Sequence, residues 1–445
     1  MGGAAPEHAL FGMSALWIAS ALLVVTYGVL LIDRINRAVV ALLGGCLMVV
    51  LGVLNQAAAI RGVDFDTIAL LAGMMVIVGI TRRSGVFQYV AIVTAQHARA
   101  HPALVLALLS LLTAAVSTLL NNVTVVLLIV PVTLAITREL KLAPYPFLFA
   151  ESFAANLGGT ATLIGDPPNM MIGSAAGLSF NDFITHLGPV VGLLVLVQVL
   201  ITHLLWGRSM HAAAADRRRV MGMVRREAIV DERLLAQSIA VLTGVVAGFV
   251  AAPRLGLEPG TIAMLGAAVL LLLDNWGRSA EEQADEIHRT FTEVEWITLF
   301  FFIGLFVVVA GVERAGLLGL LAHDVLDATG GDRATTTLLI LWGSALLSAL
   351  VDNVPFVAAM IPLVKDLAPA FGGADGLAPV WWALALGAGF GGNGTLIGAS
   401  ANLMVAGLAE RHGVRFRLWT YTLYGFPMTL VGLAICHAYV VWRYL

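Results

Sequence analysis

Two acidic residues, Asp166 and Asp352, lie within long apolar segments, where a carboxylate could bind a cation or a proton. A charged side chain at the centre of a bilayer costs at least about 2.5–3.5 kcal/mol, so such a residue is usually paired, protonated or functional. We expect Asp166 and Asp352 to bind a proton in one conformational state and to release it in another. The structural alternative is that Asp166 caps the helix that begins at Pro167-Pro168.

Both acids adjoin sequence that breaks helices. Asn121-Asn122-Val123-Thr124 matches Asp352-Asn353-Val354-Pro355, and the Gly-rich segment 158–169 matches segment 391–402. At membrane depth, irregular backbone is tolerated only where it is buried in protein or lines a cavity. We therefore expect the polar side chains and glycines of these segments to bind a solute. The candidates are Asn121, Asn122, Thr124, Gly159, Thr160, Thr162, Gly165, Asn169, Asn353, Gly392, Asn393, Gly394, Thr395 and Asn402.

These segments belong to an internal repeat. Arg83 corresponds to Arg314 and Pro131 to Pro362, both 231 positions on. After a two-residue insertion, Gly165 corresponds to Gly398, 233 positions on. Apolar similarity alone would not align prolines, glycines and asparagines in order, so the sequence indicates a duplication.

The composition requires a bilayer around this repeat. Of the 445 residues, 59% are hydrophobic and 12% charged, whereas soluble domains are about 25% charged. Apolar runs near the 20 residues that cross a membrane recur along the chain. We predict spans near 11–32, 37–54, 66–81, 147–177, 186–207, 236–253, 258–274, 294–311, 380–410 and 422–443.

Four of the predicted elements are interrupted. Segments 102–138 and 335–364 are predicted to be re-entrant hairpins, and spans 147–177 and 380–410 to be broken helices. With the N-terminus outside, most of the 25 Lys and Arg fall in cytoplasmic loops of the cell's inner (plasma) membrane. The domains are then a first repeat (1–207), a cytoplasmic linker (208–235) and a second repeat of inverted topology (236–445). The predicted fold class is an all-α polytopic membrane protein with about 10 transmembrane helices and two re-entrant hairpins.

Several other residues carry weaker expectations. Gly73 and Gly304 are expected to allow close helix packing. Glu151 and Asn156 either support the site from behind or are structural, and Thr133 is expected to bond a carbonyl of its own helix. Trp381-Trp382 resembles an interfacial aromatic belt. Cys46 and Cys436 stand alone, and we predict neither a metal site nor a cofactor.

The segment GGTATLIGDPPN at 158–169, with NNVTVVLLIVP and DNVPFVAAMIP at the hairpins, resembles the ion transporter superfamily. The resemblance is to the branch that contains arsenite permeases, NhaD-type sodium/proton antiporters and the melanosomal P protein, and it covers nearly the full length. It implies that the hairpins and broken helices form a mobile domain that moves in an elevator mechanism against a scaffold. Dicarboxylate carriers of the superfamily have Ser-Asn-Thr tips, which this chain lacks.

The expected function is proton-coupled efflux of arsenite or antimonite. An uncharged trihydroxide suits a site of amides, hydroxyls and carbonyls without a basic residue, and the site contains no cysteine that would trap a thiophilic solute. Sodium/proton exchange is the alternative, because carboxylate and carbonyl oxygens are hard ligands, and a carboxylate or sulfate substrate is less favoured. An enzyme is not expected, since no nucleophile or Walker motif occurs. A soluble ATPase subunit and a homodimer are partners implied by the resemblance, and nucleic acid is not expected.

Overall fold

The computed structural model describes residues 12–32 and 34–445, and its regular structure over these residues is helical. Within these described residues, seven helices are long and apolar enough to cross a membrane. They are α1 (Ala15–Ile32), α4 (Phe65–Arg83), α7 (Asn122–Glu139), α11 (Gly188–Leu205), α13 (Glu232–Leu255), α16 (Trp296–Arg314) and α22 (Leu418–Tyr444). The prediction of an all-α polytopic membrane protein is therefore confirmed.

The four interrupted elements are present where the sequence predicts breaks. The hairpins are α6 (Pro102–Ser117) with α7, and α18 (Arg333–Ser348) with α19 (Asn353–Asp366). The broken helices are α8 (Tyr145–Thr160) with α9 (Pro167–Ala176), and α20 (Ala378–Gly391) with α21 (Ser400–Arg411). Helix α9 begins at the proline pair because proline lacks an amide donor and fits only the first turn of a helix.

The order of helices in the first half recurs in the second. Helices α2 (Arg37–Val50), α3 (Gln56–Gly62) and α5 (Val86–His97) correspond to α14 (Pro259–Asp274), α15 (Ala280–Thr292) and α17 (Leu317–Thr329). The short helix α10 (Phe180–His186) precedes α11, and α12 (Ala214–Met221) lies in the segment between the halves. The division into repeats at 207 and 236, and their inverted orientation in the bilayer, remain predictions.

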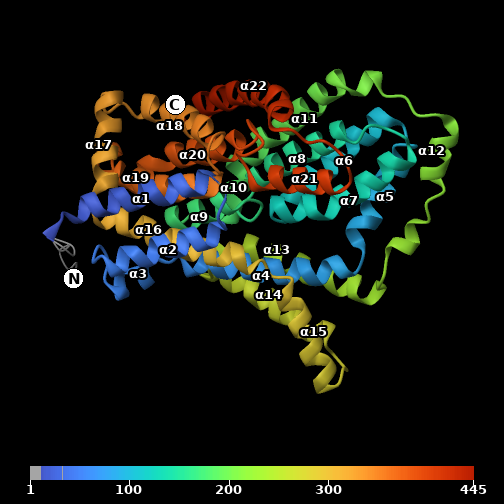
Figure 1. Cartoon of the computed structure of the whole chain (residues 1–445), viewed down its shortest axis with the longest axis horizontal. Helices are drawn as coiled ribbons and strands as arrows, with labels where there is room; N and C mark the ends of the chain where they lie inside the picture. The colour runs from blue at the N-terminus through green and yellow to red at the C-terminus, as the bar shows by residue number, and fades with distance from the viewer. Residues whose placement is uncertain (1–11, 33) are drawn as a thin grey trace.

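Helices α1, α2, α4, α13, α14 and α16 form a layer that we call the frame. Within it α2 packs on α16 and α14 packs on α4, so each contact pairs one helix from either half. A Cβ atom on Gly73 would lie 2.6 Å from the Ala263 backbone, and one on Gly304 would lie 2.4 Å from the Ala41 backbone. The expectation that these glycines permit close packing is confirmed. Helices α2, α4, α13 and α14 lie along the lower side of Figure 1.

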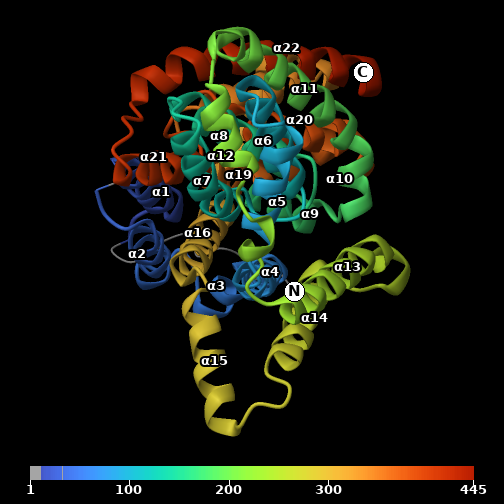
Figure 2. The ribbon, with the colours of Figure 1, turned by 90° about the vertical axis from the view of Figure 1, so that its right-hand side faces the viewer.

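The hairpins and broken helices, α6–α9 and α18–α21, form a second unit that we call the hairpin module. Helix α6 packs on α8, α18 packs on α20, and α8 also contacts α20. Residues 146–160 of α8 and 379–391 of α20 are buried on every side, which accounts for their lack of amphipathic pattern. Figure 2 shows the module as the upper body, above α4, α13 and α14.

One expectation about this layout is wrong, and two helices were not expected. Trp381 and Trp382 are 4% and 1% exposed inside α20, where the Trp382 ring stacks on His186 with 4.7 Å between centroids. The pair therefore fills the core and forms no aromatic belt. Helices α5 and α17, with 12 and 13 residues, were not predicted, because neither is long enough to resemble a span.

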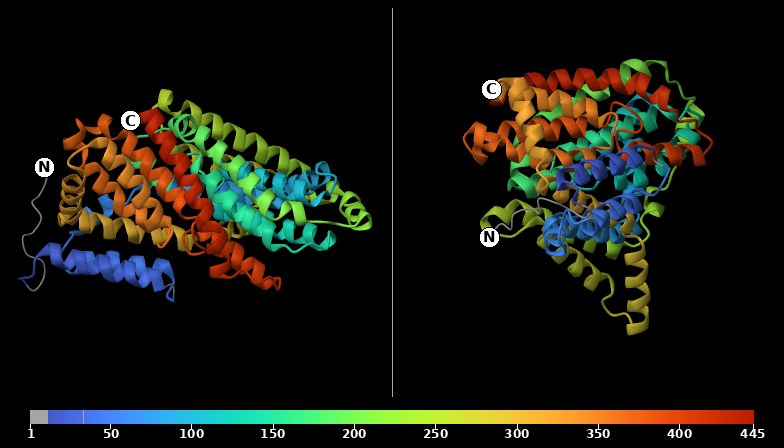
Figure 3. Two further views of the ribbon diagram at one scale, coloured as in Figure 1. Left: turned by 90° about the horizontal axis from the view of Figure 1, so that it is seen from above. Right: turned by 60° about the vertical axis from the view of Figure 1, so that its left-hand side comes forward.

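Figure 3 shows the N-terminal helices running along one face of the molecule.

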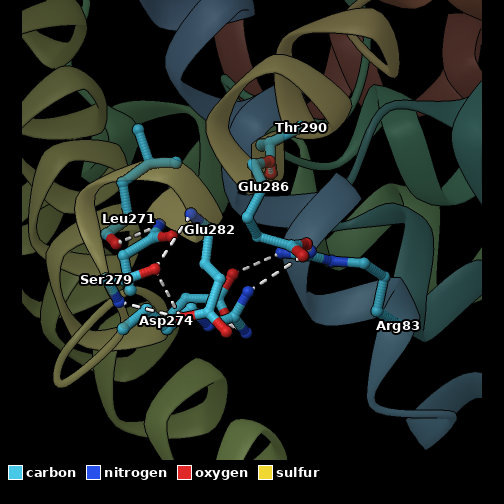
Figure 4. A network of polar contacts seen from close by, with 9 residues as sticks. Arg83, Leu271, Asp274, Ser279, Glu282, Glu286 and Thr290 are labelled. Carbon is cyan, nitrogen blue, oxygen red and sulfur yellow. Dashed lines mark hydrogen bonds and ion pairs between the residues drawn. The ribbon is translucent and has the colours of Figure 1, made fainter. Parts of the chain in front are cut away.

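Helix α15 projects from the frame (Figures 1 and 2), and ion pairs of Glu286, in the middle of the helix, join it to α4 and to the segment after α14. The Arg83 guanidinium at the end of α4 lies 2.6 Å from the Asp274 carboxylate and also contacts Glu286. Arg278 lies 2.9 Å from Glu286. Figure 4 shows the side chains of Arg83 and Glu286 directed toward one another. The Ser279 hydroxyl and the Glu282 carboxylate form a reciprocal capping box at the start of the helix, which explains why it begins there.

Candidate functional site

Two asparagines at equivalent positions hold the breaks in the two broken helices. The Asn169 side-chain amide donates to the carbonyls of Thr160 and Thr162 at 3.1 and 2.9 Å. The Asn402 amide donates to the carbonyls of Gly392 and Thr395 at 2.9 and 3.1 Å. In hydrocarbon these backbone carbonyls would otherwise lack donors, so Asn169 and Asn402 compensate for the interrupted helix.

In each half, one threonine of the break is hydrogen-bonded to the adjacent hairpin tip. The Thr162 hydroxyl donates to the Thr118 carbonyl at 2.5 Å, and the equivalent Thr395 hydroxyl donates to the Ala349 carbonyl. In the first half the Asn122 backbone N–H also donates to the Gly165 carbonyl at 3.2 Å. Hairpin tip and break are therefore one hydrogen-bonded unit in both halves.

The glycines of the breaks serve close backbone packing. A Cβ atom on Gly159 would lie 2.7 Å from the Gly165 carbonyl oxygen, and one on Gly392 would lie 2.9 Å from the Gly398 carbonyl oxygen. On Gly394 it would meet the Ala349 methyl group at 3.0 Å. Any side chain at these positions would force the two ends of the loop apart.

Asp166 lies at the junction of the two halves and is 1% exposed. The side-chain amides of Asn122 and Asn353 donate to its two carboxylate oxygens at 3.2 and 3.1 Å. These two asparagines are equivalent residues of the two hairpin tips. The Asp166 side chain makes no capping hydrogen bond to α9, so the alternative role as a helix cap is wrong.

Asp352 has a different environment, because it pairs with a basic residue of the frame. The Arg37 guanidinium lies 2.6 Å from the Asp352 carboxylate, and the Ser400 hydroxyl donates to the same oxygen at 2.6 Å. The Arg37 guanidinium also donates to the Ser400 hydroxyl oxygen at 3.1 Å. The expectation of a site without a basic residue is therefore wrong. Arg37 is the first residue of α2, and from sequence it resembles a charge in a cytoplasmic loop.

A cavity of about 190 Å³ lies between the frame and the hairpin module. The predicted site residues Asn121, Asn122, Asp166, Asp352 and Asn353 line it. Sequence reasoning missed Arg37, Glu295, Thr298 and Ser400, which also line it. Glu295 and Thr298 sit at the start of α16, where an acid is common because it complements the helix dipole.

The remaining candidates lie outside the lining of this cavity. They are Thr124, Gly159, Thr160, Thr162, Gly165, Asn169, Gly392, Asn393, Gly394, Thr395 and Asn402. Most of them shape the breaks through the contacts described above. The structure thus separates residues that face the cavity from residues that hold its walls.

Asn156 links both halves behind the cavity. It accepts a hydrogen bond from the Asn122 amide at 3.1 Å and donates to Asn393 and Asn402 at 2.8 and 2.9 Å. Asn402 also accepts from the Ser152 hydroxyl at 2.6 Å. Of the two readings open from sequence, the geometry favours support of the site, because one amide connects the first hairpin tip to the second break.

Comparison with known proteins gives a family match and several similar transporters. The model of the CitMHS family, described as citrate transporter, matches residues 27–387. An uncharacterised transporter of Mycobacterium tuberculosis is 43% identical over 96% of this chain and 98% of its own length. The human P protein is 32% identical over 96% of this chain, which spans 60% of that protein.

Two solved structures share the fold. The YdaH transporter of Alcanivorax borkumensis has a TM-score of 0.57 at 16% identity and covers 96% of this chain and 97% of its own. MtrF of Neisseria gonorrhoeae has a TM-score of 0.54 at 9% identity and covers 98% and 96%. The suspected superfamily is confirmed. The chain belongs to the CitMHS family of the ion transporter superfamily and is a multi-pass membrane transporter, not an enzyme.

Proposed function

We propose that the protein exports arsenite or antimonite in exchange for protons, through an elevator movement of the hairpin module against the frame. The observation that carries this proposal is the cavity itself. Asp166 from a break in the first half and Asp352 from a hairpin tip in the second line one space of about 190 Å³. Two carboxylates from opposite halves in one small cavity provide sites for protons and acceptors for a hydroxylated solute.

The polar lining supports a neutral trihydroxide. Arsenite near neutral pH carries three O–H donors, and the cavity offers carboxylate oxygens together with the side-chain amides of Asn121, Asn122 and Asn353. Arg37 offsets the charge of Asp352, so part of the lining is already neutralised. Neither Cys46 nor Cys436 lines the cavity, which favours release of a thiophilic solute.

The elevator movement is supported by the position of the cavity between two separately packed units. The polar contacts that cross this boundary at the cavity include those of Arg37 of α2 with Asp352 and Ser400. The Tyr27 hydroxyl of α1 also donates to the Pro355 carbonyl at 2.6 Å. These contacts end on the second hairpin tip and on Ser400 at the start of α21. Breaking them would free the hairpin module to move with its solute.

Sodium/proton exchange is the second candidate, and a specific observation favours it. Three carboxylates, Asp166, Asp352 and Glu295, line the cavity against one guanidinium, that of Arg37. This excess of negative charge suits a cation and disfavours a carboxylate or sulfate, although the matching family is described as citrate transporter.

Transport by the purified protein in proteoliposomes tests this proposal. Arsenite, Na⁺ and citrate are compared under the same imposed pH gradient. We expect proton-driven, saturable arsenite flux and little flux of citrate. Na⁺ exchange that does not depend on arsenite would overturn the leading assignment.

The cellular setting is part of the same proposal. The inner (plasma) membrane, an external N-terminus and a cytoplasmic segment 208–235 agree with the distribution of Arg and Lys. A soluble ATPase subunit and a homodimer are proposed partners on the resemblance to arsenite permeases alone.

A further inference from the structure

A third buried acid, Glu151, lies in the hairpin module away from the cavity. It is on α8, 1% exposed, and does not line the cavity. The Thr133 hydroxyl of α7 lies 2.5 Å from Glu151 Oε1. Glu151 Oε2 has no hydrogen-bond partner among the described residues. The expectation that Thr133 bonds its own helix is wrong, because its hydroxyl is directed at this acid.

The duplication supplies an internal control for this pair. Thr133 corresponds to Val364 at the offset of 231, and Glu151 corresponds to Leu384 at the offset of 233. The structure supports this register, because Ser117 donates to the Ala155 carbonyl and Ser348 donates to the Ala388 carbonyl at the same offsets.

Val364 and Leu384 are each 0% exposed, as Thr133 is. Valine and leucine have nearly the shapes of threonine and glutamate without their polar atoms. The second half therefore builds the same helix packing from an apolar pair. The fold does not require the polar pair in the first half, so its presence there points to a function.

The surroundings of Glu151 favour a neutral acid over an ion. A carboxylate with one neutral hydrogen-bond partner in a buried apolar site is poorly stabilised. A protonated carboxyl group can instead donate its O–H to the Thr133 hydroxyl oxygen, leaving a carbonyl-like oxygen that is less costly to bury. This geometry therefore favours a protonated carboxyl group at Glu151.

Charged groups on the helices that pack against α8 lie at the ends of those helices. They are Arg138 and Glu139 on α7, His203 on α11, and Glu410 and Arg411 on α21. Helices α6 and α20 carry none. Helix α22 also packs on α8, through the rings of Tyr421 and Tyr424 against Phe149, and its His437 and Arg443 lie more than three turns farther along the helix. Among the described residues Glu151 therefore forms no ion pair, in contrast to Asp352, which pairs with Arg37.

We propose that Glu151 is a second proton-binding site of the transport cycle, carried within the hairpin module and separate from the solute cavity. It lies six residues from the start of α8, about 9 Å along the helix axis, and so near the loop end of the module. The step is a simple ionisation, in which the carboxyl group releases its proton to water on the side that this end faces. This inference rests on the proposed proton coupling.

Two variants test the proposal. Glu151→Gln keeps the shape and a donor for Thr133 but cannot release a proton. The double variant Thr133→Val/Glu151→Leu copies the second-half pair and removes the site while keeping the packing. Correct folding of both is checked by size-exclusion chromatography in detergent.

The first readout is the infrared absorption of protonated carboxyl groups in the purified protein during a pH titration. We expect both variants to lose intensity that titrates in the unmodified protein. This readout needs no substrate, so it decides the proposal even if arsenite is not transported. An unchanged titration in both variants would overturn it.

The second readout is arsenite flux into proteoliposomes with and without an imposed pH gradient. We expect the ratio of the two fluxes to fall at least tenfold in both variants. A wild-type ratio and pH profile would assign Glu151 a structural role only. If the unmodified protein shows no arsenite flux, the result counts against the proposed substrate and not against the role of Glu151.

Discussion

Arg37 of the frame and Asp352 of the hairpin module form an ion pair, with 2.6 Å between guanidinium and carboxylate. The Asp352 side chain is 10% exposed and the Arg37 side chain 27% exposed. Asp166, in the same cavity, has two amide donors instead. The two acids are therefore not equivalent, because Asp352 is matched by a cation, whereas the side-chain donors to Asp166 among the described residues are neutral amides. Asp166 is thus the better candidate for proton release and uptake.

Removing the Arg37 charge should cost stability and alter transport. Removing one partner of a buried ion pair costs about 3–5 kcal/mol, and partial exposure of Arg37 should reduce this to roughly 1–3 kcal/mol. We expect Arg37→Gln to lower the thermal midpoint in detergent and to slow proton-driven flux. The double variant Arg37→Gln/Asp352→Asn should recover part of the loss. Strictly additive effects of the two single changes would show that the pair is not coupled.

The side-chain amides of the two hairpin tips, Asn122 and Asn353, should contribute similarly to proton-coupled transport. Hydrogen bonds to a charged group contribute about 1.5–3 kcal/mol, so Asn122→Ala or Asn353→Ala should weaken proton-coupled transport roughly tenfold or more. Asn55→Ala is the matched control, since Asn55 caps α3 at an exposed position outside the cavity. Initial rates across a range of external pH measure the effect. Wild-type rates in both tip variants would argue against amide control of Asp166.

The paired frame glycines should be intolerant of side chains. Gly73→Val and Gly304→Val would place atoms against the backbones of Ala263 and Ala41, and overpacking typically costs about 1–3 kcal/mol. Gly28→Ala in α1 is the control, because its Cβ meets nothing within 4 Å. Thermal unfolding in detergent should show comparable losses for the two valine variants and little change for the control. A loss in only one of them would contradict equivalent packing in the two halves.

The breaks could be predicted from sequence because their signals are local. Pro167-Pro168, the paired glycines and the matched asparagines each restrict the backbone within a few residues, and the second copy repeats the pattern. The starts of α9 and α19 follow directly from these residues.

The charge balance of the cavity could not be predicted, because it depends on contacts between distant segments. Arg37 is 315 positions from Asp352, and its place at the start of a span resembles that of any loop arginine. From sequence, Glu295 likewise resembles an ordinary acid at the border of a helix. It lines the cavity only because α16 packs beside the hairpin tips. The expectation for Trp381 and Trp382 was wrong for the same reason, because whether an aromatic pair faces lipid or protein depends on which helices surround it.

Net arsenite flux in proteoliposomes under an imposed proton gradient, compared among the unmodified protein, Asp166→Asn and Asp352→Asn, tests most directly whether this cavity couples solute to protons. We expect both variants to fold, as judged by size-exclusion chromatography, and to lose the stimulation by the proton gradient, with Asp166→Asn retaining less than a tenth of it. Gradient-driven flux at the wild-type level in both variants would contradict a role of the two acids in coupling.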